Sequence, residues 1–76
     1  MTDMPRFNIE INHQIVKCDT EEDRQLLRDA KAIADDPSSA KPMGLDRLHL
    51  IKDACQRYSI GTLQRSVKRE IDKIGS

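Results

Sequence analysis

The residues best suited to bind another molecule lie near the C-terminus, in the segment YSIGTLQRSVKREIDKI at 58–74. Glutamine and arginine can read base edges in the major groove, and lysine and arginine also hold phosphate. This segment carries four such side chains at helical spacing: Gln64, Arg65, Lys68 and Arg69. They share the outward side of a helix, and Lys73 continues that side. The pattern predicts a nucleic-acid-binding face.

The other side of the same segment is apolar. Five apolar residues recur three or four positions apart: Ile60, Leu63, Val67, Ile71 and Ile74. This spacing is typical of a helix face that packs on a core. Glu70 and Asp72 interrupt the basic side, and a mixed charged face is also typical of an ordinary solvated helix. The segment alone leaves both interpretations of its basic side open.

Two histidines and two cysteines could in principle supply a zinc site: His13, Cys18, His49 and Cys55. The expected geometry opposes this. His13 and Cys18 would lie at opposite ends of one strand, about 15 Å apart. His49 and Cys55 are six residues apart on an expected helix and therefore point in different directions. We expect no metal and no other cofactor, with His49 at the solvent edge and Cys55 in the core.

The remaining polar residues suggest no catalytic site. The acidic run at 21–23 falls at the expected start of a helix, where carboxylates interact favourably with the positive end of the helix dipole. There is no glycine-rich phosphate loop, and no serine, cysteine or lysine has a base beside it in the sequence. So small a domain also has little room for an enclosed pocket. We expect no enzymatic activity.

A β-hairpin is the first element expected to position these residues. Apolar and polar side chains alternate through RFNIEINHQIVKCD, which is the period-2 pattern of half-buried strands. A two-residue turn at 12–13 would place three pairs opposite one another: Phe7 and Cys18, Ile9 and Val16, Ile11 and Gln14. In that register the apolar residues of both strands share one face, and only Ile15 lies on the other.

Helical periodicity follows the hairpin. We expect a helix at about 20–35 with Asp19 as its N-cap, and a surface loop at 36–44, where proline, serine and glycine are frequent. The apolar stripe of the helix at 20–35 comprises Leu26, Leu27, Ala30, Ile33 and Ala34. A second helix should begin near 45 and form the centre of the fold. Its apolar face comprises Leu48, Ile51, Cys55 and Tyr58, widened by Leu50 and Ala54.

A short turn capped by Ser59 should lead into the last helix, at about 60–74, so that the last two helices adopt a helix-turn-helix-like order. The predicted fold is α+β, an N-terminal hairpin followed by three helices. The chain of 76 residues forms one domain, with a frayed N-terminus at 1–5. Because only 37% of its residues are hydrophobic, we expect a homodimer or a bound partner to add stability.

Charge is balanced overall but divided between the two halves of the chain. Residues 1–38 hold five basic and nine acidic side chains, a balance of −4, whereas residues 39–76 hold eight and four, a balance of +4. The N-terminus has no secretory-signal pattern, and no apolar run approaches the roughly 20 residues of a membrane span. We expect a cytoplasmic protein with reduced thiols and no membrane contact.

Two segments together resemble the ribbon-helix-helix family of small dimeric repressors. They are MPRFNIEI at 4–11 and LDRLHLIKDACQRYSIGTLQRSVKREI at 45–71. In that family two strands pair across a dimer and enter the major groove, so the resemblance implies base contacts from Arg6, Asn8 and Glu10. It also implies a phosphate at the start of the last helix, beside Ser59. About thirty residues separate the segments here, whereas the family joins them almost directly, and Tyr58 replaces a turn glycine.

Two functions are compatible with these observations. The first is a sequence-specific DNA-binding regulator, a repressor or antitoxin-like protein, that contacts double-stranded DNA. Its contact residues would be Gln64, Arg65, Lys68, Arg69, Lys73, Ser59, Arg6 and Asn8. The alternative is a non-enzymatic protein-interaction module, an inhibitor or adaptor, that binds a protein through the hairpin or the first helix. Zero net charge and an acidic first half favour the alternative, because acidic residues repel DNA.

Overall fold

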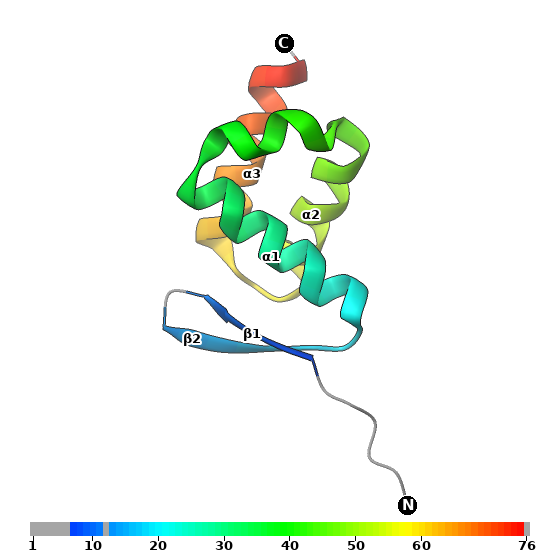
Figure 1. Ribbon diagram of the computed structural model, residues 1–76, viewed down its shortest axis with the longest axis vertical. Coiled ribbons are helices and arrows are strands. Elements are labelled where there is room, and N and C mark those ends of the chain that lie inside the picture. The colour runs from blue at the N-terminus through cyan, green and yellow to red at the C-terminus, as the bar shows by residue number, and fades with distance from the viewer. Residues whose placement is uncertain (1–6, 12, 76) are drawn as a thin grey trace, which may run out of the picture.

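The computed structural model describes residues 7–11 and 13–75 and contains a hairpin followed by helices (Figure 1). In chain order its elements are β1 (Phe7–Ile11), β2 (Gln14–Cys18), α1 (Glu21–Asp35), the 3₁₀ helix η1 (Pro37–Met43), α2 (Leu45–Arg57) and α3 (Gly61–Gly75). The predicted α+β fold is therefore confirmed, with one helix more than the sequence indicated. The hairpin lies beneath α1, and α2 and α3 pack on one another (Figure 1).

The hairpin has the register that its alternating residues predict. Phe7 pairs with Cys18, Ile9 with Val16, and Ile11 with Gln14 in an antiparallel ladder. The inward side chains of Ile9, Ile11 and Cys18 are buried. Ile15, on the other face, is 70% exposed. A shift of one residue would exchange these two faces, so burial of the apolar set fixes the register.

The first helix begins one residue later than predicted. Thr20, and not Asp19, is the N-cap of α1, and its hydroxyl oxygen accepts a 3.0 Å hydrogen bond from the Asp23 N–H. Thr20 also has the extended backbone that an N-cap needs. The Asp19 N–H instead donates to the Tyr58 hydroxyl at 2.9 Å. Asp19 therefore belongs to the link between the hairpin and α1.

The segment predicted as a surface loop contains η1, and this prediction is wrong in an important respect. Asp36 caps η1 by accepting hydrogen bonds from the N–H and the hydroxyl of Ser38, at 3.2 and 2.7 Å. Pro37 occupies the first turn, where its fixed φ suits a helix and its missing N–H costs nothing. Ala40, in the middle of η1, is fully buried. The segment therefore stays largely at the surface, as predicted, but it is helical, contributes Ala40 to the core and packs against α1, α2 and α3.

One hydrophobic core joins all the elements. Among them α1 contacts both strands and all three other helices, whereas α2 packs only against α1, α3 and η1. The predicted centre therefore lies as much on α1 as on α2, although Leu48, Ile51, Ala54 and Cys55 of α2 are fully buried. No helix in residues 7–11 and 13–75 combines the length and the apolar character that crossing a membrane would require.

Three residues that the periodic stripes placed inside lie outside. Ala34 is exposed on α1, Leu50 on α2 is 49% exposed, and Ile74 near the end of α3 is 38% exposed. Leu50 directly precedes Ile51 and so lies about 100° from it around α2, beside the buried stripe. Ile74 occupies the last turn of α3. The stripes are therefore narrower and shorter than predicted.

The turn between α2 and α3 closes the end of α2. The Ser59 N–H donates to the Gln56 carbonyl at 3.1 Å, and the Ile60 N–H donates to the Cys55 carbonyl at 2.9 Å. Ser59 has a φ of 58°. These two bonds and the left-handed residue form a Schellman motif, in which glycine is the usual residue. The prediction that Ser59 caps the last helix is therefore wrong, because Ser59 ends α2 instead.

Replacing Ser59 with glycine should stabilise the chain by about 0.5–1 kcal/mol. The left-handed conformation costs an L-residue roughly 1–2 kcal/mol, and glycine avoids this cost but loses more backbone entropy on folding. Urea denaturation of both proteins would measure the difference. Ser59→Ala is the matched control, because it removes the hydroxyl and keeps the Cβ. An equal gain from Ser59→Ala would contradict the explanation.

Candidate nucleic-acid interface

The inward side of α3 fixes the helix on the core. Leu63 and Val67 are buried, and Ile60 and Ile71 pack against the core from its edges. Glu70 lies on the flank of this side and is 8% exposed. The Ile60 carbonyl accepts a 3.0 Å bond from the Gln64 N–H, which begins the helical bonding. Packing on α1, α2 and η1 therefore sets which residues α3 turns outward.

The outward side of α3 carries the predicted contact residues together. We call Gln64, Arg65, Lys68 and Arg69 the α3 face. Its three cations are exposed, and Gln64 is half-buried. No ion pair or side-chain hydrogen bond links these four residues to another residue in the described part of the chain. The face is thus free to offer its charges and donors to a ligand.

Lys73 continues the face but is partly neutralised. Its ammonium lies 3.3 Å from the Glu70 carboxylate, one turn back along α3. Asp72 is exposed on the same side of the helix. Basic character is therefore concentrated in the first two-thirds of α3. From Gly61 to Arg69 the helix rises about 12 Å, which is close to the roughly 12 Å width of the major groove.

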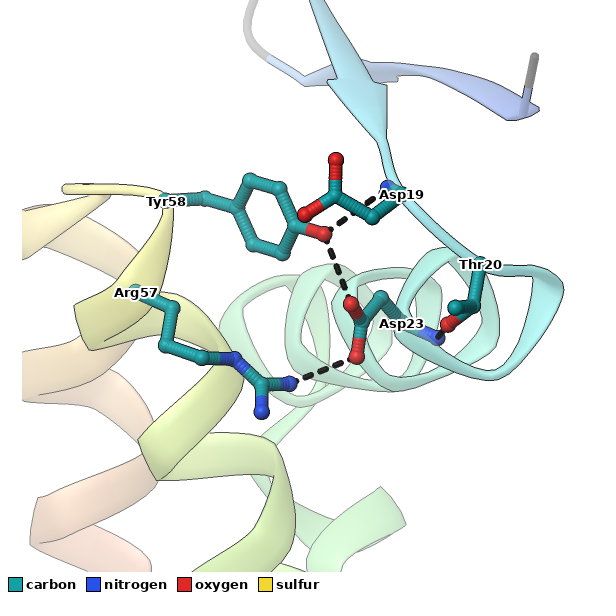
Figure 2. A network of polar contacts seen from close by, with 5 residues as sticks. All are labelled: Asp19, Thr20, Asp23, Arg57 and Tyr58. Carbon is teal, nitrogen blue, oxygen red and sulfur yellow. Dashed lines mark hydrogen bonds and ion pairs between the residues drawn. The ribbon is translucent and has the colours of Figure 1, made fainter.

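A polar network holds the α2–α3 turn against the start of α1 (Figure 2). The Tyr58 hydroxyl accepts from the Asp19 N–H at 2.9 Å and donates to the Asp23 carboxylate at 2.7 Å. The other oxygen of Asp23 accepts from the Arg57 guanidinium at 2.5 Å. Thr20 accepts from the N–H of the same aspartate. Arg57 and Tyr58 are 34 and 35 positions from Asp23 in the sequence. The network therefore fixes the turn before α3 relative to the start of α1.

Sequence reasoning missed this network. The prediction assigned Asp23 only to the helix dipole and Tyr58 only to an apolar face. A Thr-x-x-Asp spacing at 20–23 resembles a capping box and could have identified Thr20. The pairing of Asp23 with Arg57 and Tyr58 has no local signal, because it depends on how α1 and α2 pack.

Removing the Tyr58 hydroxyl should cost about 1–2 kcal/mol of the free energy of unfolding. Tyr58→Phe keeps the ring but leaves the half-buried Asp23 carboxylate without one donor, and a bond to a charged group typically contributes more than a neutral one. Urea denaturation would measure the loss. Asp23→Asn tests the coupling, because the double variant should lose less than the sum of the two single losses. Strict additivity would contradict a shared network.

The predicted contact residues outside α3 do not join its face. Asn8 and Glu10 are exposed on β1, and β1 has no contact with α3. Ser59 lies in the turn before α3, with its backbone committed to the end of α2. Arg6 lies outside the described residues. The structure therefore places Asn8 and Glu10, the described residues that the resemblance implies as base contacts, apart from the α3 face.

Both cysteines are free and buried, Cys18 on β2 and Cys55 on α2. Burial raises the pKa of Cys55 to about 11. Burial also raises the pKa of Cys18, with a further contribution from the nearby Asp23 and Asp19 carboxylates. In the described ranges no three His, Cys, Asp or Glu side chains gather as a possible metal site. The thiols therefore act as small core side chains in their protonated form.

Alkaline pH should destabilise the fold through Cys55. A folded-state pKa raised from about 9 to about 11 means that the protonated thiol contributes its full stability below pH 9 and loses it as the pH approaches and passes 11. We expect a fall of about 2–3 kcal/mol from this thiol over that range. Urea denaturation at each pH would measure it.

Cys55→Ala is the control for this pH dependence, because it removes the titrating group. Tyr58 contributes in the same direction, since burial raises the pKa of its hydroxyl above the ordinary value of 10. Its share should persist in Cys55→Ala and disappear in Tyr58→Phe. A pH profile that is the same with and without the thiol would contradict the prediction.

Comparison with protein-family models, with curated proteins and with solved structures found no match to this chain.

Proposed function

We propose that the chain is a small sequence-specific DNA-binding regulator that places α3 in the major groove. The observation that carries the proposal is the α3 face, whose three cations and one amide are accessible and have no protein partners in the described residues. Arginine can bind guanine in a bidentate manner, and glutamine can do the same with adenine. Lysine and the remaining arginine then hold phosphate and fix the register.

The order of the last two helices supports the proposal. Helix α2, a three-residue turn and α3 with its exposed basic side follow one another as in a helix-turn-helix, in which the second helix carries the base contacts near its N-terminus. The Schellman motif and the polar network at Tyr58 hold the turn rigidly. A rigid turn stabilises binding because α3 needs no further ordering when DNA arrives.

The start of α3 offers a further contact. Ser59 is committed to the end of α2, and Ile60, an apolar residue, stands immediately before α3. The first N–H groups of a helix have no partner within it and attract anions. A phosphate beside these groups would fix the helix next to the backbone of the duplex, which is the contact that the ribbon-helix-helix resemblance also implies.

We further propose that the regulator acts as a homodimer. Two α3 helices related by a two-fold axis would read two half-sites about 34 Å apart, on one side of the duplex. Analytical ultracentrifugation with and without a palindromic duplex would test this. A strictly monomeric complex on such a duplex would overturn the dimer without affecting the proposal for α3.

The test of DNA binding is the salt dependence of the native protein. Fluorescence anisotropy with a labelled duplex should give a logarithmic affinity that falls linearly with the logarithm of salt concentration. The expected slope is about −0.9 for each phosphate contact. Selection from a random duplex pool should then enrich one sequence. Absence of salt-dependent binding at low ionic strength would overturn the proposal.

A further inference from the structure

A groove of about 420 Å³ lies between β1 and α1, away from the α3 face. The residues that matter for its chemistry are Asn8, Ile9 and Glu10 on the strand, and Arg24, Arg28 and Lys31 on the helix. In the view of Figure 1, β1 and α1 run in the same general direction, with the hairpin beneath the helix. An extended chain could therefore lie along both elements at once.

The strand offers an edge with free backbone groups. Among the described residues β1 pairs only with β2, so its other edge has no partner strand. Paired residues in an antiparallel hairpin alternate between exchanging both backbone bonds and exchanging none, and the pair next to a two-residue turn exchanges both. With Ile11 and Gln14 as that pair, the backbone groups of Asn8 and Glu10 point to the free edge. These are the strand residues that border the groove together with Ile9.

The helix offers a row of cations. Arg24, Arg28 and Lys31 are four and three residues apart and so lie on one side of α1. None of the three forms an ion pair with another residue in the described part of the chain. The Nε of Arg24 is buried and has no hydrogen-bond partner among the residues that the structure describes. Burying such a donor without a partner is unfavourable, and an acceptor that enters the groove would remove the cost.

We propose that this groove binds an extended acidic segment of a partner protein, which adds as a strand to the free edge of β1. Backbone bonds to Asn8 and Glu10 hold the segment, and its acidic side chains meet the cation row of α1. Same-face residues of an added strand lie about 6.8 Å apart. Arg24 and Arg28 are about 6 Å apart along the helix axis, so glutamates at alternate positions match their spacing.

A second copy of the chain fits the groove less well. Pairing of two β1 edges would add the same strand, but its inward residues are Ile9 and Ile11, which are buried in their own core. The one carboxylate of that strand, Glu10, alternates with Ile9 and Ile11 and so lies on the opposite face, and the two cation rows would add charge of one sign. Asp35, one turn beyond Lys31, closes the row and limits acidic side chains to its first part. Charge complementarity therefore favours an acidic partner.

The probe is a short synthetic peptide with glutamate at every second position and valine or threonine between. Its matched control has glutamine at the same positions. We expect the glutamate peptide to bind the native protein roughly tenfold more tightly, because its carboxylates can pair with Arg24 and Arg28 and the amides of the glutamine peptide cannot. Hydrogen exchange followed by NMR should detect new protection at the amides of Asn8 and Glu10.

Two triple variants locate the site. The α1 triple variant (Arg24→Gln, Arg28→Gln and Lys31→Gln) should abolish the difference between the two peptides. The α3 triple variant (Arg65→Gln, Lys68→Gln and Arg69→Gln) changes net charge equally and should leave the difference intact. Because the peptide comparison uses the native protein, it stays decisive even if the α1 triple variant folds poorly. The inference is independent of DNA binding by α3.

Four results would overturn the inference. The peptides could bind equally, or the glutamate peptide could bind without protection of Asn8 and Glu10. A single-stranded oligonucleotide could protect the same amides more strongly than the peptide, which would assign the groove to nucleic acid. Protection that appears with rising protein concentration and no peptide would assign the edge to a second copy of the chain.

Discussion

Replacing Ala40 with aspartate is expected to unfold the chain, whereas the same replacement at Ala34 should cost about 1 kcal/mol or less. Ala40 is fully buried in η1, so a carboxylate there has neither water nor a built-in partner. An unpaired buried charge costs several kcal/mol. A domain of this size has a net stability of about 3–5 kcal/mol, so the loss should consume most or all of it.

The control is closely matched because both positions are alanines in helices and each substitution adds one negative charge. Ala34 is exposed, so its carboxylate stays in water and costs only helix propensity and an unfavourable dipole interaction near the end of α1. Far-UV circular dichroism and urea denaturation of the two variants would measure the difference. Equal stability of the two variants would contradict the burial of Ala40.

These two alanines also mark where the sequence was misleading. The periodic stripe placed Ala34 inside, and the frequency of proline and serine placed position 40 on the surface. Alanine is small and occurs in both environments, so its identity carries little information about burial. What buries Ala40 is the packing of η1 on the other helices, and packing between distant elements leaves no local pattern.

The hairpin and the orientation of α3 were predictable for a physical reason. Both present one apolar side and one polar side, and burying the apolar side is the largest favourable contribution to folding. The period of the pattern therefore determines which way Ile9 points on a strand and which way Val67 points on a helix. Both residues are buried.

The details of the candidate site were not predictable because they depend on tertiary contacts. Asp23, Arg57 and Tyr58 meet only because α1 and α2 pack side by side. Ser59 has a left-handed conformation, which its residue type does not predict. It therefore ends α2, although serine is a common N-cap and was predicted to begin α3. The groove beside β1 likewise exists only once α1 has packed on the hairpin.

The α3 triple variant should lose most of the salt-dependent affinity for DNA. Because two of its three cations would each hold one phosphate and the third would contact guanine, their removal flattens the logarithmic salt slope by about 1.8 and also removes a base contact. Affinity at 0.1 M salt should then fall roughly 10²- to 10³-fold. Arg65, Lys68 and Arg69 are exposed, so their replacement by glutamine should change the free energy of unfolding by about 0.5 kcal/mol or less. Anisotropy titrations at several salt concentrations, with urea denaturation alongside, would measure both quantities.

The α1 triple variant decides whether a loss of affinity belongs to α3 or to net charge. It removes three positive charges, as the α3 triple variant does, but from a different face. A protein that binds DNA only through its overall electrostatic field should therefore lose affinity equally in both variants. Binding through α3 requires the slope to fall in the α3 triple variant and to remain near the native value in the α1 triple variant. The two surfaces then have separate ligands, because the α3 face would hold phosphates while the groove on α1 holds carboxylates. Equal flattening in the two variants would instead reduce DNA binding to a general electrostatic attraction and remove the basis for a recognition helix.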